Sequence, residues 1–188
     1  MSRLSRERPL LFILKIIFSP YNKLRNKYYG FAFSTRGLII GKNISIVGSK
    51  NINIGHHVIL GNQTWLDAIG TGSITIGNDV SLSQNVHIAA SESVTIDDGC
   101  LIGSDVLISD HDHSFGGDSA MILPKHRPLS VRDATKLGKN CWLGDNVKIL
   151  SGVTLGNNVV VAANSVVTRS FPDNVVIGGT PAKILKNI

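Results

Sequence analysis

Aliphatic residues recur at every sixth position along most of the chain, starting at Ile40. The series slips by two residues after Ile46, and its largest break lies between Ile108 and Leu137. Its members are Ile40, Ile46, Ile54, Leu60, Ile76, Leu82, Ile88, Ile96, Ile102, Ile108, Leu137, Leu143, Ile149, Leu155, Val161 and Val167. A period of six fits neither an α-helix, with about 3.6 residues per turn, nor an antiparallel meander with turns every 8–12 residues or so.

The residues between the aliphatic positions predict flat sides joined by tight corners. Six times the aliphatic residue is followed by Gly-x-Asn or Gly-x-Asp, ending at Asn43, Asp79, Asp105, Asn140, Asn146 and Asn158. Gly, Asn and Asp tolerate the left-handed backbone that a tight corner needs, and β-branched residues favour the strands between corners. Three sides close one triangular coil, and the aliphatic side chains stack inward from coil to coil.

This repeat resembles that of the hexapeptide-repeat acyltransferases, over about Ile40–Ile188. The resemblance implies an all-β fold, a left-handed parallel β-helix of hexapeptide repeats. We expect a basic, apolar helical segment over residues 1–36 and the β-helix domain over residues 37–188. Within that domain we expect an extruded loop over residues 109–136 and a C-terminal tail over residues 171–188. Cys100 and Cys141 fall on small inward positions of the repeat and are interpreted as core residues rather than nucleophiles.

The basic excess of the chain is confined to its first 36 residues. They hold eight Lys or Arg against Glu7, giving +7, whereas the remaining 152 residues carry −1 and the whole chain +6. A nucleic-acid-binding protein would spread a basic stripe over its fold, so a nucleic-acid partner is not expected. Two cysteines in 188 residues exclude a disulfide scaffold.

Residues 10–18 form an apolar run that only Lys15 interrupts. Two interpretations of this run stay open. It can be a short helix that packs on the body or on a neighbouring subunit. Alternatively, it can be a peripheral membrane anchor whose flanking Lys and Arg face anionic headgroups. The second interpretation predicts a cytoplasmic protein peripheral to the inner face of a bacterial cytoplasmic membrane.

The large break in the period is the candidate functional loop, because loops that leave a rigid scaffold tend to carry function. It holds three of the six histidines, His111, His113 and His126. The other three, His56, His57 and His87, are interpreted as surface or structural residues.

The loop begins with Asp110-His111-Asp112-His113, which is similar to the Asp-His-x-His motif of hexapeptide enzymes that O-acetylate sugars and polysaccharides. That resemblance makes His111 the general base. An imidazole with a pKa near 6.5 can take the proton of a sugar hydroxyl and return it to a leaving thiolate. Asp110, Asp112 or a backbone carbonyl would orient it, and His113 would face the acceptor.

The same resemblance implies an acetyl-coenzyme A site in the C-terminal coils. Trp142 would border the thioester, with nearby backbone N–H groups stabilising the oxyanion. The remaining residues assigned to the donor are Gly144, Asp145, Ala162, Ala163, Thr168, Arg169, Lys183 and Lys186. Lys183 ends a closing Gly-x-Pro-Ala-Lys motif, and Lys186 follows it by three residues. Arg169 and the two lysines would meet the phosphates. Trp65 and Asp67, near an insertion over residues 65–71, would line the acceptor side.

The family resemblance, together with the chemistry of these residues, implies an acetyl-CoA-dependent O-acetyltransferase acting on a sugar hydroxyl, without a metal. We expect it to serve cell-surface polysaccharide biosynthesis, such as an O-antigen of lipopolysaccharide, a capsule or an exopolysaccharide. The family resemblance implies a homotrimer with sites between subunits. Three alternatives stay open. These are an N-acyltransferase acting on an amino-sugar nucleotide, a zinc-dependent β-helix hydratase using His111, His113 and His126, and a non-catalytic binding module.

Overall fold

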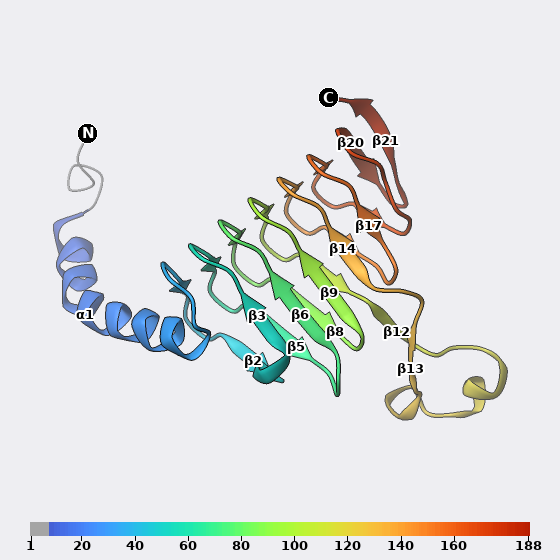
Figure 1. Ribbon diagram of the computed structural model, residues 1–188, viewed down its shortest axis with the longest axis horizontal. Coiled ribbons are helices and arrows are strands. Elements are labelled where there is room, and N and C mark those ends of the chain that lie inside the picture. Colours follow the sequence, from blue (N-terminus) through green and yellow to red (C-terminus); the bar gives the residue numbers. More distant parts are fainter. Residues whose placement is uncertain (1–7) are drawn as a thin grey trace.

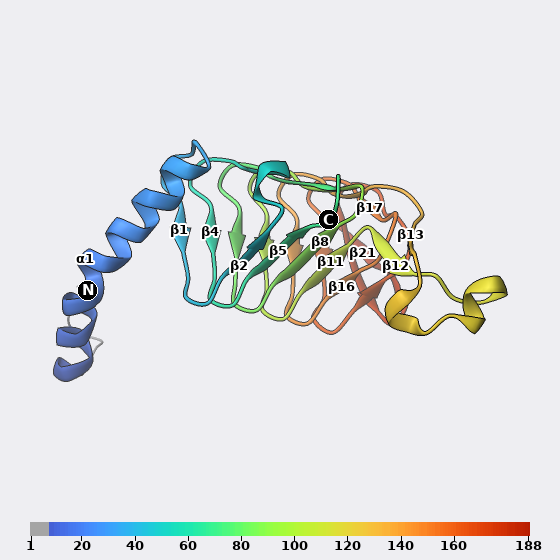
Figure 2. The same ribbon diagram turned by 90° about the horizontal axis from the view of Figure 1, so that it is seen from below.

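A computed structural model describes residues 8–188 of the chain, so Arg3, Arg6 and Glu7 of the basic head lie outside the described residues. One helix, α1 (Pro9–Ala32), precedes a column of short parallel strands (Figures 1 and 2). The predicted parallel β-helix of hexapeptide repeats is therefore confirmed.

The strands of the column form three sheets, one on each side, which we name A, B and C, and a separate two-stranded antiparallel sheet lies outside the column. Sheet A holds β1 (Ile39–Ile40), β4 (Ile59–Leu60), β7 (Ser81–Leu82), β10 (Leu101–Ile102), β15 (Trp142–Leu143), β18 (Val160–Val161), β20 (Val175–Gly179) and β21 (Ala182–Asn187). Sheet B holds β2 (Ser45–Val47), β5 (Trp65–Ala68), β8 (His87–Ala90), β11 (Leu107–Ser109), β16 (Lys148–Ile149) and β19 (Val166–Val167). Sheet C holds β3 (Ile52–Ile54), β6 (Ser73–Ile76), β9 (Ser93–Ile96), β14 (Thr135–Leu137) and β17 (Thr154–Leu155).

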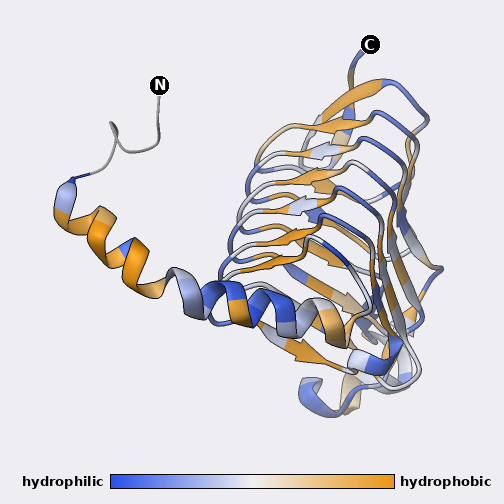
Figure 3. Cartoon of the chain, turned by 60° about the vertical axis from the view of Figure 1, so that its left-hand side comes forward, coloured by the Kyte–Doolittle hydropathy of each residue, from blue (hydrophilic) through white to orange (hydrophobic). Residues whose placement is uncertain are grey.

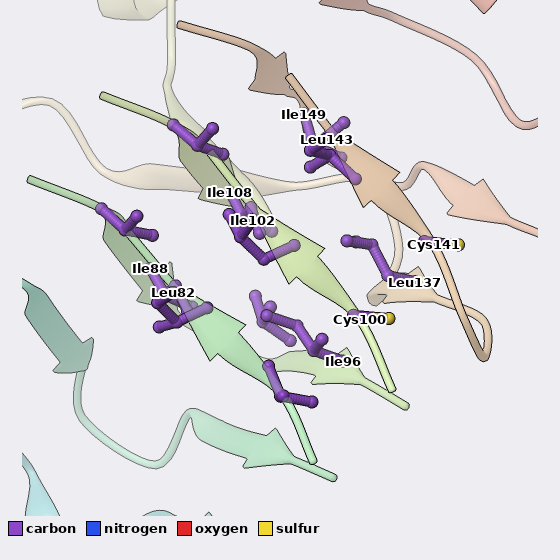
Figure 4. Packing of buried hydrophobic residues seen from close by; sticks show 14 of the residues in the cluster. Leu82, Ile88, Ile96, Cys100, Ile102, Ile108, Leu137, Cys141, Leu143 and Ile149 are labelled. Carbon is purple, nitrogen blue, oxygen red and sulfur yellow. The ribbon is translucent and has the colours of Figure 1, made fainter. Parts of the chain in front are cut away.

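The column of aliphatic side chains forms the core. Every member of the predicted series is buried except Ile46, which packs against the core while partly exposed. Cys100 and Cys141 are buried among them, as predicted. Figure 4 shows the side chains of successive coils pointing toward one another inside the column. Each coil therefore covers the apolar interior of the next one.

The corners confirm the role expected of Asn and Asp. All six predicted residues, Asn43, Asp79, Asp105, Asn140, Asn146 and Asn158, have φ between 54° and 60°. Their side chains also connect neighbouring coils: the Asn146 amide donates to Asn164 at 2.9 Å, and the Asn158 amide donates to Asn174 at 2.9 Å. Glycine at these corners meets a second demand, because a Cβ on Gly144 would lie 2.7 Å from the backbone nitrogen of Ala163.

The residues inserted beyond the six-residue repeat lie along one edge of the column, between sheets B and C. They occupy residues 48–51, which include the 3₁₀ turn η2 (Ser49–Asn51), then residues 69–72 and 91–92, and finally residues 110–134. The insertion expected over residues 65–71 is thus shorter, because residues 65–68 are strand β5 and Leu66 is a buried ladder residue. The core column admits no extra residue, so every insertion is placed at a corner.

The C-terminal half of helix α1 is attached to the first coil. The Arg25 guanidinium donates to the Ile40 carbonyl, the Ile40 amide donates to Asn26 Oδ1 at 3.1 Å, and Tyr29 packs against the core. The N-terminal half leads away from the column and is its apolar part (Figure 3). Within residues 8–188, no helix combines the length and the apolar character needed to cross a bilayer.

The ladder predicts a sharp contrast between two neighbouring residues of β4. Leu60 is fully buried and Ile59 is 38% exposed. Leu60→Ala leaves a cavity in the column and should lower the free energy of unfolding by about 2–5 kcal/mol. Ile59→Ala should change it by less than about 1 kcal/mol. Guanidinium denaturation at one fixed protein concentration measures both, and equal losses in the two variants would refute the inward ladder.

Candidate active site

His111 lies where the chain leaves sheet B. Strand β11 ends at Ser109, and His111 begins β12 (His111–His113), which pairs antiparallel with β13 (Leu129–Val131). This hairpin, with the 3₁₀ turns η3 (Gly117–Met121) and η4 (Pro124–His126) beyond it, projects from the column in Figure 2. The predicted extruded loop is thus a hairpin that carries its histidine at the base, close to the rigid coil.

The Asp110 side chain anchors this point of departure. It is fully buried and receives four N–H groups. The backbone amides of Ser91, Glu92 and Ser93 donate to its two oxygens at 2.7–2.8 Å, and the ring of His111 donates to Oδ1 at 2.9 Å. A carboxylate, which only accepts hydrogen bonds, is the form that satisfies four donors at once.

The contact with Asp110 fixes the orientation of the His111 ring. Because Nδ1 faces an acceptor, the neutral ring carries its hydrogen on Nδ1, and Nε2 keeps a free lone pair. The side chain is 12% exposed. Asp112 is exposed on the hairpin and makes no such contact. Of the three orienting groups that the sequence left open, the structure therefore selects Asp110.

Two buried hydroxyls brace the backbone around Asp110. Thr135 Oγ1 donates to the Ser109 carbonyl at 3.0 Å, and Ser151 Oγ donates to the Asp110 carbonyl. Ser151 also accepts the Arg132 amide at 3.2 Å, which ties the returning end of the hairpin to the next coil. Neither Thr135 nor Ser151 was predicted from the sequence to support the site. The feature that could have indicated them is a hydroxyl side chain next to the break in the repeat: Thr135 begins the strand after the break, and Ser151 lies in a corner of the next coil.

A groove of about 370 Å³ lies on sheet A and gathers most of the residues assigned to the donor. Trp142, 53% exposed, forms one side of it. Its other lining residues are Ser83, Leu101, Gly103, Leu143, Gly144, Asp145, Val160, Val161, Ala162 and Ala163. The small side chains over 162–163 leave a narrow passage, so the groove suits a slender flexible ligand. Six of these lining residues are additions to the predicted set: Ser83, Leu101, Gly103, Leu143, Val160 and Val161.

The basic residues assigned to the donor divide into two groups. Trp142 pairs with Val160, Val160 with Val176, and Val176 with Lys186, which places Lys186 three strand spacings or about 14 Å from Trp142. Lys183 is three residues earlier on β21, where it pairs with Gly178. Thr168 and Arg169 instead follow β19 at the edge between sheets B and C, where the Arg169 guanidinium lies 5.3 Å from the Phe171 ring centre.

His111 and the groove lie on opposite sides of the column. Each coil runs through sheets A, B and C in turn, so the edge between B and C is opposite sheet A. His111 leaves from that edge, and Arg169 lies on the same edge further along the column. A single chain therefore does not bring the imidazole of His111 to the face that carries Trp142.

A second imidazole lies on sheet B beside the site. His87, interpreted from sequence as a surface or structural residue, is half-buried and stacks on Trp65 with ring centres 4.0 Å apart and planes 5° apart. Burial lowers the pKa of His87, the charge of Asp67 opposes that shift, and His111 adds to it. Trp65, Asp67, His87 and His111 therefore form one neighbourhood.

The remaining titratable candidates fall outside this neighbourhood. His113 and His126 are exposed on the hairpin, and residues 8–188 contain no group of three His, Cys, Asp or Glu side chains that could hold a metal ion. The Cys100 and Cys141 thiols donate to the carbonyls of Gly138 and Gly156, each at 3.2 Å. The neighbouring Cys141 side chain, together with burial, raises the pKa of the Cys100 thiol.

Comparison with known proteins identifies relatives along most of the chain. Residues 134–169 match the family "Bacterial transferase hexapeptide (six repeats)". Escherichia coli WbbJ, named as a lipopolysaccharide biosynthesis O-acetyl transferase, is 46% identical over 140 residues, 72% of this chain and 71% of that protein. Escherichia coli galactoside O-acetyltransferase is 33% identical over 133 residues, 69% of this chain and 63% of its own length. The colanic acid biosynthesis acetyltransferase WcaF of the same species is 27% identical over 164 residues, which are 85% of this chain and 75% of that protein.

Solved structures share the fold. The hexapeptide-repeat acetyltransferase VCA0836 of Vibrio cholerae, complexed with acetyl-coenzyme A, has a TM-score of 0.56 and 31% identity over 68% of this chain and 69% of its own. AntD, an N-acyltransferase from Bacillus cereus in complex with dTDP and 3-hydroxybutyryl-CoA, has a TM-score of 0.75 but 22% identity, over 87% of each chain, and shows the fold alone. The identity with WbbJ over more than two thirds of both proteins shows that this chain belongs to the hexapeptide-repeat acetyltransferases.

Proposed function

We propose that this enzyme transfers an acetyl group from acetyl-coenzyme A to a sugar hydroxyl during the synthesis of a bacterial surface polysaccharide. The observation that carries the proposal is the Asp110–His111 pair, whose imidazole presents a free Nε2 at the base of the hairpin. The names of WbbJ and WcaF connect such chemistry with lipopolysaccharide and colanic acid. The likeness to AntD, at 22% identity, gives no argument for an amine acceptor.

The groove on sheet A fits the donor. A narrow passage floored by Ala162 and Ala163 suits the pantetheine arm, Trp142 borders one side, and Lys186 lies about 14 Å along the same sheet, where it can meet phosphates. When bound there, acetyl-coenzyme A supplies the activated thioester. VCA0836, a relative of this chain, is complexed with the same compound.

His111 moves the proton in this proposal. Its Nε2 accepts the hydrogen of the acceptor hydroxyl as the oxygen attacks the thioester carbon, and the ring then delivers that proton to the departing sulfur. Asp110 stabilises the imidazolium and holds the ring in place with its 2.9 Å contact. The buried amides around Asp110 make this support rigid. General base help of this kind contributes roughly 10²–10⁴ in rate.

The placement of His111 opposite sheet A supports a site shared between subunits. We infer a homotrimer in which the B–C edge of one chain, with His111 and Arg169, faces the groove of its neighbour. Arg169 then joins Lys183 and Lys186 of the neighbouring chain near the phosphates. Cyclic symmetry gives three identical sites.

Removing the base tests the mechanism. His111→Ala should cut turnover at least about a hundredfold while coenzyme A binding stays nearly intact, because the donor groove lies on another face. The measurement pairs a thiol-release assay on a surface polysaccharide with calorimetric titration of coenzyme A. His57→Ala, an exposed histidine paired with Asp79 at 3.4 Å, is the matched control and should retain wild-type turnover. Normal turnover by His111→Ala would remove this residue from the mechanism.

Mixed trimers test the shared site. His111→Ala removes the base, and Ala163→Trp fills the neighbouring groove at an exposed position, so each variant alone should be inactive. Random association of equal amounts should restore about a quarter of wild-type activity, because one interface in four then combines two intact halves. Co-expression with two affinity tags provides the mixture. A mixture as inactive as its parents would place the whole site within one chain.

We further propose that α1 holds the enzyme at the cytoplasmic face of the bacterial membrane. Seven apolar residues, exposed by 43–69%, surround the helix over positions 10–18: Leu10, Leu11, Ile13, Leu14, Ile16, Ile17 and Phe18. A helix that is apolar on all sides needs an apolar environment. The following turns carry Lys23 and Lys27, which suit anionic headgroups.

Vesicle sedimentation tests this anchor. The wild-type chain should sediment with vesicles of phosphatidylglycerol and phosphatidylcholine more than with phosphatidylcholine alone, and less at high salt. Ile13→Asp combined with Ile17→Asp should abolish sedimentation, and Ile59→Asp on the column should not. If the double variant instead dissociates the trimer, α1 packs on a neighbouring subunit and the membrane proposal fails.

A further inference from the structure

Trp65 presents an aromatic face to solvent on the outside of sheet B. One face of its indole is covered by the His87 ring, which lies parallel at 4.0 Å. The strand neighbour on the other side is Ser45, whose exposed side chain is too short to cover an indole. The residue is 42% exposed. Trp65 therefore offers one supported and one free face.

His87 supports Trp65 as a neutral ring. Its Nε2 is shielded from solvent and has no hydrogen-bond partner within residues 8–188. A protonated ring would leave a charged N–H without an acceptor there, which is costly, and burial accordingly lowers the pKa of His87. The stacked pair is thus a fixed aromatic surface rather than a second acid–base group.

A carboxylate accompanies the aromatic surface. Asp67 lies two residues after Trp65 on β5, so both side chains point outward from the same face of sheet B. It is partly exposed and makes no hydrogen bond within residues 8–188, although its charge acts on His87. Its oxygens are free to accept hydrogen bonds from hydroxyl groups.

This surface is continuous with the base of the hairpin but distant from the reacting atoms. Asp67 pairs with Ala89 on the neighbouring strand, and Ala89 pairs with Ser109 on the next one, two residues before His111. Two strand spacings separate β5 from β11, about 10 Å, and the free face of Trp65 points further toward the first coil. A ring stacked on Trp65 therefore cannot be the sugar whose hydroxyl meets His111.

We propose that the outer face of sheet B from His111 to Trp65 is an extended subsite for a glycan chain, in which a sugar remote from the acetylated one stacks on Trp65. An aromatic face suits the apolar side of a pyranose ring, and the Asp67 carboxylate suits its hydroxyl groups. This inference rests on the proposed function and deepens it. The acceptor is an oligosaccharide or polymer rather than a free sugar or a sugar nucleotide.

Acceptor length tests the subsite. De-O-acetylated oligosaccharides from a bacterial O-chain, separated into fractions of one to six sugars, serve as acceptors in the thiol-release assay. The wild-type KM should fall about threefold to tenfold from the monosaccharide to the tetrasaccharide fraction, the range expected for one aromatic stacking contact. Trp65→Ala should bring this KM ratio to about one, and Trp65→Phe should keep most of it. Ile59→Ala, in the same coil but on sheet A, is the control and should keep the whole ratio.

A binding readout separates this inference from the proposed activity. Trp142→Phe leaves Trp65 as the sole tryptophan, so its fluorescence reports on the subsite directly. The tetrasaccharide fraction should change this fluorescence in a saturable manner, and the monosaccharide fraction should not. Saturable binding to this variant, combined with no thiol release by the wild-type enzyme, would refute the transferase proposal while sustaining the subsite. A wild-type KM independent of length, or an altered oligomeric state in Trp65→Ala, would overturn the subsite and assign Trp65 to a contact between chains.

Discussion

Each coil of this β-helix buries its aliphatic side chains only against the coils above and below it, and that requirement governs the rest of the molecule. An extra residue inside a side would turn the ladder outward, so insertions are restricted to corners. Here they collect on the edge between sheets B and C. The longest of them is the hairpin that carries His111, which is why the imidazole is fixed opposite the groove of sheet A.

The buried carboxylate of Asp110 gives the imidazole of His111 the fixed orientation that a general base needs. Burying a charge is costly unless donors surround it, and here three backbone amides of the preceding coil and the His111 ring do so. The same group that closes the corner between β8 and β9 therefore orients the imidazole. Stability of the coil and orientation of the base depend on one side chain, which a flexible surface loop could not provide.

Much of this architecture was predictable because it is periodic. The ladder, the Asn and Asp corners and the residues of the sheet A groove follow from spacing and from the family resemblance. Contacts between neighbouring coils join residues roughly twenty positions apart, and the sequence does not state which side chains of one face meet. His87 beneath Trp65, and Ser151 beneath Asp110, were missed for that reason. The choice between Asp110 and Asp112 depended on a backbone turn that no pattern encodes.

In the proposed trimer, the base of one subunit serves the donor groove of another. A structure of the assembled protein with coenzyme A bound tests it most directly, through the distance from the ligand sulfur to the nearest His111 Nε2. We expect the sulfur to lie beside Trp142 of one chain and within about 4 Å of an imidazole from the neighbouring chain. Coenzyme A on sheet A with no imidazole from another chain in reach would contradict it.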